Sequence, residues 1–361
     1  CSRPGRGRPN SSSTLATAKT RRPTRAADSV TRRGRRIGLA QMSGARPIVT
    51  LCMNPALDIT TSTAVVSPTD KLRCAAARYD AGGGGINVAH VARVLGATAA
   101  AVFPAGGPAG ELVDSLLVAG GLTTHRVMIG GSTRESFTVD ELSTKRQYRF
   151  VLPGPQLTIA EQTECLLRLR QAAASAAVVV ASGSLPPGVP KDFYQQVANV
   201  CADLNATFLL DTSGGGLAGV DAGVFLVKPS LRELREAVGR ALNTDAEQLG
   251  AARELISRGT AQYVLVSRGA GGALLASRDD GKLFAPVAVP PGSGVGAGDA
   301  MVAGVAVGLT RGWPLAEAVR LGIAAGAAML LTPGTAPCTR KDTERLLEQT
   351  ERPVDIGQYA G

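Results

Sequence analysis

The segment Ser293-Gly294-Val295-Gly296-Ala297-Gly298-Asp299-Ala300-Met301 is the pattern around which the rest of the chain is interpreted. A glycine-rich turn leads through Asp299 into an apolar run, residues 300–309, which is long enough for about three turns of helix. Such a helix start presents unpaired N–H groups and the positive end of the helix dipole, so it predicts a binding site for an anion, phosphate in particular. Asp299 either complements this dipole or accepts a proton from a hydroxyl group that attacks the bound phosphate.

The charge of the chain is concentrated in its first 46 residues. They contain 12 Lys/Arg and a single acid, Asp28, whereas the other residues contain 27 basic and 28 acidic side chains. A nearly neutral body argues against a nucleic-acid-binding protein. We expect residues 1–46 to be a disordered basic tail that contributes nothing to the fold. A transit peptide and a nucleic-acid-binding arm are the alternatives for this tail.

The cysteines and histidines exclude several classes of site. Six cysteines are scattered without a C-x-x-C pair, and the chain has only two histidines. This composition argues against a zinc site, a disulfide scaffold and a Ser-His-Asp triad, and it predicts a cytoplasmic protein. No uncharged apolar run is long enough to span a bilayer, so we expect no membrane association.

Predicted strands and helices alternate from residue 47 to residue 345. This order is typical of an α/β fold in which helices cover both faces of a mostly parallel sheet. A hairpin, 136–139 with 147–152, stands apart from the alternation. The helix at 315–331 is expected to be the last one. The other predicted strands are 47–53, 98–104, 178–181, 207–211, 224–227 and 263–267, and the other helices begin near 88, 110, 158, 231 and 244.

Two further groups of residues favour a ligand site. Asp58 follows the first predicted strand, and open α/β sheets bind ligands beyond the carboxyl ends of their strands. The run Gly82-Gly83-Gly84-Gly85 lets a ligand approach the backbone, and Asn87 offers both donors and acceptors to sugar hydroxyls. The spacing departs from G-x-G-x-x-G, so a dinucleotide-binding fold is a poor match.

The segments 82–87 and 296–299, in this order, resemble the two signatures of the ribokinase-type, phosphofructokinase-B family of carbohydrate kinases. Within that family the chain is similar to ATP-dependent 6-phosphofructokinases, and the resemblance extends from about residue 48 to residue 343. It implies a ribokinase-like three-layer sandwich at 47–345, with a small β-sheet lid from about 58–82 and 130–152. Residues 346–361 would then be a C-terminal tail, and the lid would pair two subunits into a homodimer.

The resemblance also implies a reaction and a role for each site residue. The enzyme would use ATP and Mg²⁺ to phosphorylate the 1-hydroxyl of fructose 6-phosphate, giving fructose 1,6-bisphosphate. The implied roles are Asp299 as general base; Gly296, Ala297 and Gly298 as anion hole; Asp58, Gly83 and Asn87 as sugar-hydroxyl contacts; Lys71, Arg134 and Ser184 as contacts to the sugar phosphate; Lys228, Ser267 and Gly269 as ATP contacts; and Glu233 as a magnesium contact through water.

Three positions depart from the family pattern. Ser230 stands where asparagine is common, Gly294 where threonine is usual, and His90 where related sequences often have arginine. Two related activities remain open, 1-phosphofructokinase and tagatose-6-phosphate kinase. Those enzymes often carry lysine at the position of Gly84, so its absence favours the 6-phosphofructokinase branch. A catalytically weak sugar-phosphate-binding protein is a further alternative, which the presence of Asp299 argues against.

Overall fold

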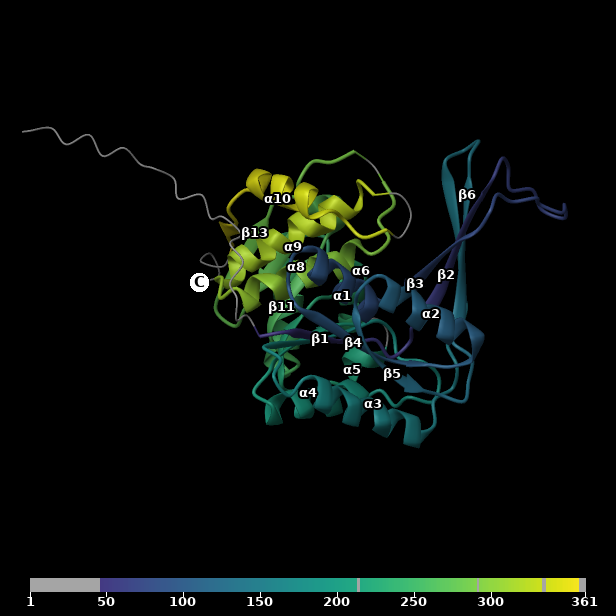
Figure 1. Ribbon diagram of the computed structural model, residues 1–361. Helices are drawn as coiled ribbons and strands as arrows, with labels where there is room; N and C mark the ends of the chain where they lie inside the picture. The colour runs from purple at the N-terminus through teal and green to yellow at the C-terminus, as the bar shows by residue number, and fades with distance from the viewer. Residues whose placement is uncertain (1–45, 213–214, 291, 333–335, 357–361) are drawn as a thin grey trace, which may run out of the picture. The chain divides into compact units, whose positions relative to one another are not determined.

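The computed structural model describes residues 46–212, 215–290, 292–332 and 336–356 (Figure 1). The predicted basic tail therefore lies outside the described residues, except for Arg46. Within the described part, the strands form a ten-stranded and a four-stranded sheet. No helix of the described residues combines the length and apolarity needed to cross a membrane.

The large sheet has the strand order β14-β13-β12-β11-β10-β9-β8-β1-β4-β5. The strands from β5 to β11 in this order are parallel, and β12, β13 and β14 are antiparallel to their neighbours. Strands such as β1 and β8 are buried along their whole length because helices cover both faces. The bounds are β1 Ile48–Leu51, β4 Ala99–Ala105, β5 Thr123–Met128, β8 Val178–Ser182, β9 Thr207–Asp211, β10 Val224–Val227, β11 Ala261–Ser267, β12 Ala273–Ala276, β13 Gly281–Phe284 and β14 Val354–Asp355.

Two apolar clusters, one on each face of the large sheet, make the core. Ile48 and Val49 are neighbours on β1, and because strand side chains alternate they belong to different clusters. The first cluster includes residues of α1 (Gly84–Val94), α2 (Gly107–Ala119), α8 (Ala297–Thr310), α9 (Leu315–Met329) and α10 (Arg340–Gln349). The second includes residues of α3 (Ile159–Ala172), α4 (Phe193–Asp203), α5 (Gly215–Ala218), α6 (Leu231–Val238) and α7 (Asp245–Ser257). This arrangement confirms the predicted three-layer α/β sandwich.

The chain changes direction across the large sheet at β1. The strands β4 and β5 lie on one side of β1, whereas β8 to β11 follow on the other side. The carboxyl ends of β1 and β8 therefore form a topological switch point, where open α/β sheets bind their ligands.

The small sheet has the order β3-β2-β6-β7, with β2 and β6 parallel and the other pairs antiparallel. Its strands are β2 (Ala56–Thr63), β3 (Arg78–Gly82), β6 (Arg134–Glu141) and β7 (Arg146–Val151). They come from the two segments that the sequence assigns to the lid. Asp58 follows β1, as predicted, but it lies inside β2 rather than directly at the carboxyl end of β1. The reason is that β2 pairs on both edges, with β3 and β6, which no local pattern reveals.

The fold continues beyond the predicted boundary at residue 345. The helix α10 runs from Arg340 to Gln349, so the helix at 315–331 is not the last one. Its sequence is mostly charged and buries only Thr343 and Leu346, so it has little apolar periodicity to detect. The two-residue strand β14 pairs with β13, and this contact depends on the tertiary fold alone. The interpretation of 346–361 as a tail is therefore wrong for residues 346–355.

Candidate active site

Polar side chains stand at the carboxyl ends of neighbouring parallel strands. Ser182 ends β8, Asp211 ends β9 and Ser267 ends β11, while Lys228 directly follows β10. Because the strands are parallel, these residues lie along one edge of the sheet. This edge includes the switch point, so the fold gathers the candidate site there.

The start of α8 has an open backbone. Gly296 caps the helix with a φ of 75°, a left-handed conformation that suits glycine. The N–H groups of Gly298 and Asp299 have no acceptor among the described residues, whereas Ala297 N donates to the Gly294 carbonyl at 3.2 Å. Of the predicted anion hole, Gly298 thus keeps a free N–H group, whereas the N–H group of Ala297 is already used in the turn, and Asp299 adds a second free N–H group that the sequence did not assign to the hole.

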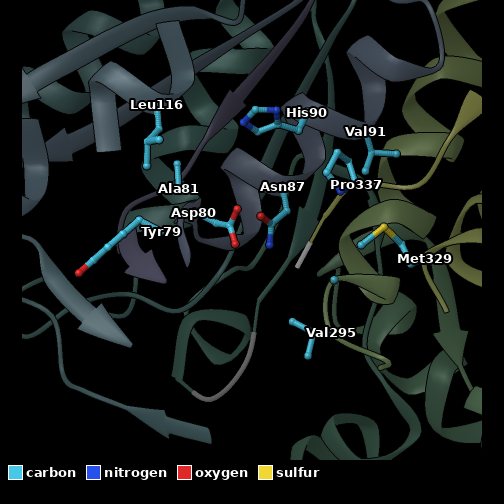
Figure 2. Close-up of a pocket in the computed structure, with 11 residues that line it drawn as sticks. Tyr79, Asp80, Ala81, Asn87, His90, Val91, Leu116, Val295, Met329 and Pro337 are labelled. Carbon is cyan, nitrogen blue, oxygen red and sulfur yellow. The ribbon is translucent and has the colours of Figure 1, made fainter. Parts of the chain in front are cut away.

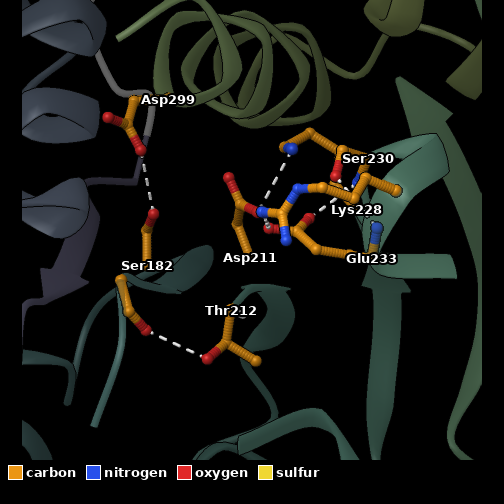
Figure 3. A network of polar contacts seen from close by, with 9 residues as sticks. Ser182, Asp211, Thr212, Lys228, Ser230, Glu233 and Asp299 are labelled. Atoms are coloured by element: carbon orange, nitrogen blue, oxygen red, sulfur yellow. Dashed lines mark hydrogen bonds and ion pairs between the residues drawn. The ribbon is translucent and has the colours of Figure 1, made fainter. Parts of the chain in front are cut away.

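The Asp299 carboxylate is held from two sides. Asn87 Nδ2, in the first turn of α1, donates to Asp299 Oδ2 at 2.9 Å. Ser182 Oγ donates to Asp299 Oδ1 at 3.1 Å (Figure 3). The side chain is only partly exposed. These two contacts fix the plane of the carboxylate and leave its remaining lone pairs for a substrate hydroxyl.

The environment makes Asp299 a stronger base than an ordinary aspartate. Burial, with a smaller contribution from the nearby Asp211 charge, raises the pKa of Asp299 to about 6. The hydrogen bonds from Asn87 and Ser182 and the charge of Lys228 oppose this shift. A carboxylate with this pKa is ionised at neutral pH and still basic enough to accept a proton, as a general base requires.

A buried ion pair lies beside the anion-binding turn. Lys228 Nζ is 3.1 Å from Asp211 Oδ1, and both side chains are largely buried (Figure 3). A Cβ atom added to Gly298 would lie 3.4 Å from Lys228 Nζ, so the ammonium group adjoins the start of α8. Burial raises the pKa of Asp211, which the Lys228 charge counteracts. The pair therefore places one ammonium group next to the two free N–H groups.

Sequence reasoning missed Asp211 and Ser182 as functional residues. Both are the last residues of predicted buried strands, next to the edge where such folds bind ligands. Their position at the ends of these strands is the sequence feature from which a role in the site could be predicted. Their partners, Lys228 and Asp299, are distant in sequence, so the contacts themselves depend on the tertiary structure.

The four glycines at 82–85 form a tightly packed turn. A Cβ atom at Gly83 would lie 2.6 Å from Cys52 Sγ, and one at Gly84 would lie 2.3 Å from Ser182 Oγ. A Cβ atom at Gly82 would lie 2.1 Å from Asp58 Oδ2, and one at Gly85 would lie 2.5 Å from the Leu51 carbonyl oxygen. These contacts bring the small sheet, the end of β1 and Ser182 together around the start of α1.

Asp58 lies against this turn, on the small sheet. Burial raises the pKa of Asp58 to about 6, whereas the charges of Arg149 and Arg134 lower it. The carboxylate thus adjoins both the glycine turn and a basic part of the small sheet. Lys71 is different, because it lies exposed in the connection between β2 and β3. No hydrogen bond or ion pair among the described residues joins Lys71 to the rest of the site.

Arg134 connects the small sheet to the body. Its guanidinium donates to the carbonyls of Asn54 at 3.0 Å, Leu152 at 3.2 Å and Pro55 at 3.4 Å. Of five guanidinium N–H groups, two remain beyond these contacts. Ser184, in the loop after β8, is placed close to the same segment, since Asn54 Nδ2 donates to Ser184 Oγ at 3.2 Å. The structure therefore brings Arg134 and Ser184 together around Asn54.

The residues predicted for the nucleotide meet at the ends of β10 and β11. Ser230 and Ser267 form an isolated parallel β-bridge, and the Ser267 N–H donates to the Pro229 carbonyl. Gly269 follows with a φ of 57°, at the start of a short 3₁₀ helix, Gly269–Gly271. Ser230 and Glu233 form a capping box: Ser230 N donates to Glu233 Oε2 at 2.8 Å and Glu233 N to Ser230 Oγ at 3.2 Å. Ser230, at the position where asparagine is common in the family, thus acts as the N-cap of α6.

The carboxylates near Lys228 suit magnesium that arrives with a nucleotide. Glu233 is close enough to Asp211 to raise its pKa. In the described part of the chain, no three His, Cys, Asp or Glu side chains gather into a metal site. Mg²⁺ usually binds through one or two carboxylates together with substrate phosphates and water, and these two carboxylates match that pattern.

A cavity of about 160 Å³ adjoins the site. It shares Asn87 and Gly296 with the site and is also lined by His90 and Met329 (Figure 2). Burial and the Arg93 charge lower the pKa of His90. His90, one of the three positions that depart from the family pattern, thus lines this cavity, whereas Asp299 does not.

Comparisons with known proteins agree with this geometry. The model of the "pfkB family carbohydrate kinase" matches residues 48–342. The ATP-dependent 6-phosphofructokinase isozyme 2 of Mycobacterium tuberculosis is 60% identical over 86% of this chain and 92% of its own length. The 1-phosphofructokinase of Xanthomonas campestris is 36% identical over 72% of this chain and 83% of its own length.

A solved structure matches as well. The phosphofructokinase-2 of Escherichia coli in complex with fructose-6-phosphate superimposes with a TM-score of 0.77 at 35% identity, covering 84% of this chain and 99% of that one. The family model spans both glycine turns and every strand of the large sheet except β14. The chain belongs to the pfkB family of carbohydrate kinases.

Proposed function

We propose that this protein is an ATP-dependent 6-phosphofructokinase, which converts fructose 6-phosphate and ATP into fructose 1,6-bisphosphate and ADP. The observation that carries the proposal is the Asp299 carboxylate, held by Asn87 and Ser182 at the open start of α8. The 60% identity to a 6-phosphofructokinase supports the choice of substrate.

In the proposed reaction Asp299 accepts the proton of the sugar 1-hydroxyl as that oxygen attacks the γ-phosphorus of ATP. The new O–P bond forms as the bond to the β-phosphate oxygen breaks, and ADP leaves with that electron pair. The N–H groups of Gly298 and Asp299 and the Lys228 ammonium stabilise the negative charge of the transferring phosphoryl group. Asp211 holds Lys228 in place through their ion pair.

We assign the two substrates to different groups of residues around Asp299. We assign the sugar hydroxyls to Asp58, Asn87 and the Gly83 backbone, because these groups surround the packed glycine turn. We assign binding of the 6-phosphate to the Ser184 hydroxyl and to the two remaining N–H groups of Arg134. Lys71 is assigned to the 6-phosphate only because of the family resemblance.

The nucleotide occupies the edge formed by β10 and β11 in this proposal. Ser267 and Gly269 lie next to the adenine nucleotide, and Lys228 contacts its phosphates. Asp211 and Glu233 would hold Mg²⁺, Glu233 through water, since one of its oxygens already caps α6. A bound Mg²⁺ would supply positive charge that neutralises the phosphates.

We further propose a homodimer that forms through the small sheet. Tyr79, Ile59, Phe137 and Phe150 are register partners across all four strands, so they lie on one face. The three aromatic side chains are exposed, between 37% and 56%. A second copy of this face would cover them, because a small sheet with an apolar face is stabilised by a partner. Light scattering on wild type and on Phe137→Lys tests this, since a monomeric wild type would contradict it.

A panel of phosphosugars with MgATP tests the activity. We expect kcat/KM to be highest with fructose 6-phosphate and lower with fructose 1-phosphate and tagatose 6-phosphate. A preference for fructose 1-phosphate would favour the 1-phosphofructokinase alternative, whose relatives this chain also matches. No turnover with any sugar phosphate that nevertheless binds would identify a binding protein.

The glycine at position 84 favours the first outcome. A side chain at Gly84 would collide with Ser182 Oγ and with the backbone N of Gly183, at 2.3 and 2.9 Å. The lysine common in the alternative enzymes would therefore not fit this turn. We propose a cytoplasmic location, because the five cysteines in the described part of the chain are free thiols.

A further inference from the structure

Asn54 occupies the switch point of the large sheet without a role in the reaction described so far. It follows β1 closely, and its side chain is only 7% exposed. Its Nδ2 donates to Ser184 Oγ at 3.2 Å, and its backbone carbonyl accepts from Arg134 Nη2 at 3.0 Å. The two groups assigned to the sugar phosphate are thus both bonded to this residue.

The bond from Asn54 decides which way the Ser184 hydroxyl points. A serine hydroxyl has one hydrogen to donate and two lone pairs to accept with, whereas a phosphate dianion only accepts. Because Ser184 Oγ accepts from Asn54, its own hydrogen remains available for an acceptor outside the protein. With Asn54 absent, the hydroxyl would lose the partner that orients it.

Close packing holds the Asn54 side chain in place. Its Oδ1 is buried and has no hydrogen-bond partner among the described residues. A Cβ atom at Gly154 would lie 2.1 Å from Asn54 Oδ1, so glycine at 154 leaves the space that the amide fills. A buried acceptor without a partner is unfavourable.

The segment that carries Ser184 is fixed from its other side. The Gly183 carbonyl accepts from Tyr194 OH at 2.9 Å and from Thr212 Oγ1 at 3.0 Å. Tyr194 is fully buried. The loop therefore has little freedom, and the remaining variable is the rotation of the Ser184 side chain.

We infer that Asn54 is a positioning residue for the sugar phosphate: it orients the Ser184 hydroxyl as a donor toward the 6-phosphate. This inference rests on the proposed function, because it requires a phosphorylated sugar at this site. The Asn54 side chain acts only through Ser184, since the contact to Arg134 is made by the backbone.

The test is a double-mutant cycle on the purified full chain. KM for fructose 6-phosphate, KM for ATP and kcat are measured for wild type, Asn54→Ala, Ser184→Ala and the double variant. Loss of one oriented hydrogen bond should raise KM for fructose 6-phosphate about 2- to 10-fold in Asn54→Ala. KM for ATP should stay unchanged. In the Ser184→Ala background, the second substitution should raise KM no further.

Two other variants keep the test decisive if Asn54→Ala does not fold. Asn54→Asp has the same shape, but its carboxylate takes the Ser184 hydrogen and repels the phosphate, so KM should rise more than in Asn54→Ala. Gly154→Ala displaces the amide without touching Ser184 and should also raise KM for fructose 6-phosphate. Thr50→Val is the control, a buried polar residue of β1 outside the site.

The outcomes separate the inference from the function. Equal increases for both substrates, or the same increase in the Ser184→Ala background, would overturn the role of Asn54 while leaving the kinase intact. Unchanged kinetics in Asn54→Asp and Gly154→Ala would also overturn it. A wild-type protein that does not phosphorylate fructose 6-phosphate would refute the proposed function, and the inference with it.

Discussion

The two glycine-rich helix starts face each other but differ in what surrounds them. At α1 the glycines are packed against protein, with Cβ positions 2.1 to 2.6 Å from Asp58, Cys52, Ser182 and Leu51. At α8 a Cβ on Gly294 would meet nothing within 4 Å, and one on Gly298 would lie 3.4 Å from Lys228 Nζ and 3.9 Å from Asp211 Oδ2. A Cβ on Gly296 would meet only the end of the flexible Met329 side chain, at 3.1 Å. The same composition therefore serves close packing in one turn and access for a ligand in the other.

Their chemistry differs accordingly. The turn at α1 ends in Asn87, which donates a hydrogen bond, and the turn at α8 ends in Asp299, which accepts it. The packed turn thus supplies a rigid support for the carboxylate, and the open turn supplies the space and the N–H groups for the reacting phosphate. Substitutions on each side should separate these two contributions.

Asp299→Asn tests the open turn and should have the largest effect. The amide retains the size of the side chain but cannot accept the hydroxyl proton, so kcat should fall at least about 100-fold. Calorimetry should show that both substrates still bind, with circular dichroism as the folding control. A kcat close to that of wild type would mean that Asp299 only complements the helix dipole.

Gly84→Ala tests the packed turn. The added Cβ would overlap Ser182 Oγ and the Gly183 backbone, so the variant should unfold about 1–3 kcal/mol more easily. Displacing Ser182 also disturbs the orientation of Asp299, and kcat should fall about 10- to 100-fold. Urea unfolding and steady-state kinetics measure the two effects. Normal stability would show that this turn has room that the structure does not indicate.

The pH dependence of the wild-type enzyme reports on the two carboxylates at these turns. Burial raises the pKa of both Asp299 and Asp58 to about 6. The base must be ionised to act, so kcat/KM should rise with pH through about 6 and level off above 7. Below the pKa the rate should change about tenfold per pH unit or more. A flat profile between pH 5 and about 7 would contradict the assignment.

The same pKa predicts a smaller effect on stability. A carboxyl group whose folded-state pKa is raised above the ordinary value of 3.8 is most favourable to folding when protonated, and this contribution is lost as pH rises toward 6. Asp299→Asn should therefore be up to about 3 kcal/mol more stable than wild type at neutral pH. The difference should vanish near pH 4. Thermal unfolding at several pH values measures it, and a less stable variant at neutral pH would contradict the shift.

Gly294→Ala should have the smallest effect and is the matched control for Gly84→Ala. Nothing lies within 4 Å of the added Cβ, so the free energy of unfolding should change by less than about 0.5 kcal/mol. Activity should remain close to that of wild type. A loss comparable to that of Gly84→Ala would remove the distinction between the packed and the open turn.

Several elements were predictable because their signals are local. The strands at 207–211 and 224–227 and the helix at 231–238 coincide with β9, β10 and α6. The helices predicted to begin near 158 and 244 start there with capping boxes at Thr158 and Thr244, each of which needs only a side chain three residues away. The helix α10 and the strand β14 were missed because one is mostly charged and the other pairs only in the folded chain.

By itself the sequence determined the alternation of strands and helices, the two glycine turns and the place of Asp299 in the first turn of its helix, because these depend on neighbouring residues. Only the tertiary structure decided that the turn at α1 is packed and the one at α8 open. It also decided that Asn87 and Ser182 hold Asp299 from positions 212 and 117 residues away. Such contacts arise when parallel strands bring distant carboxyl ends to one edge, a consequence of sheet order that no local pattern contains.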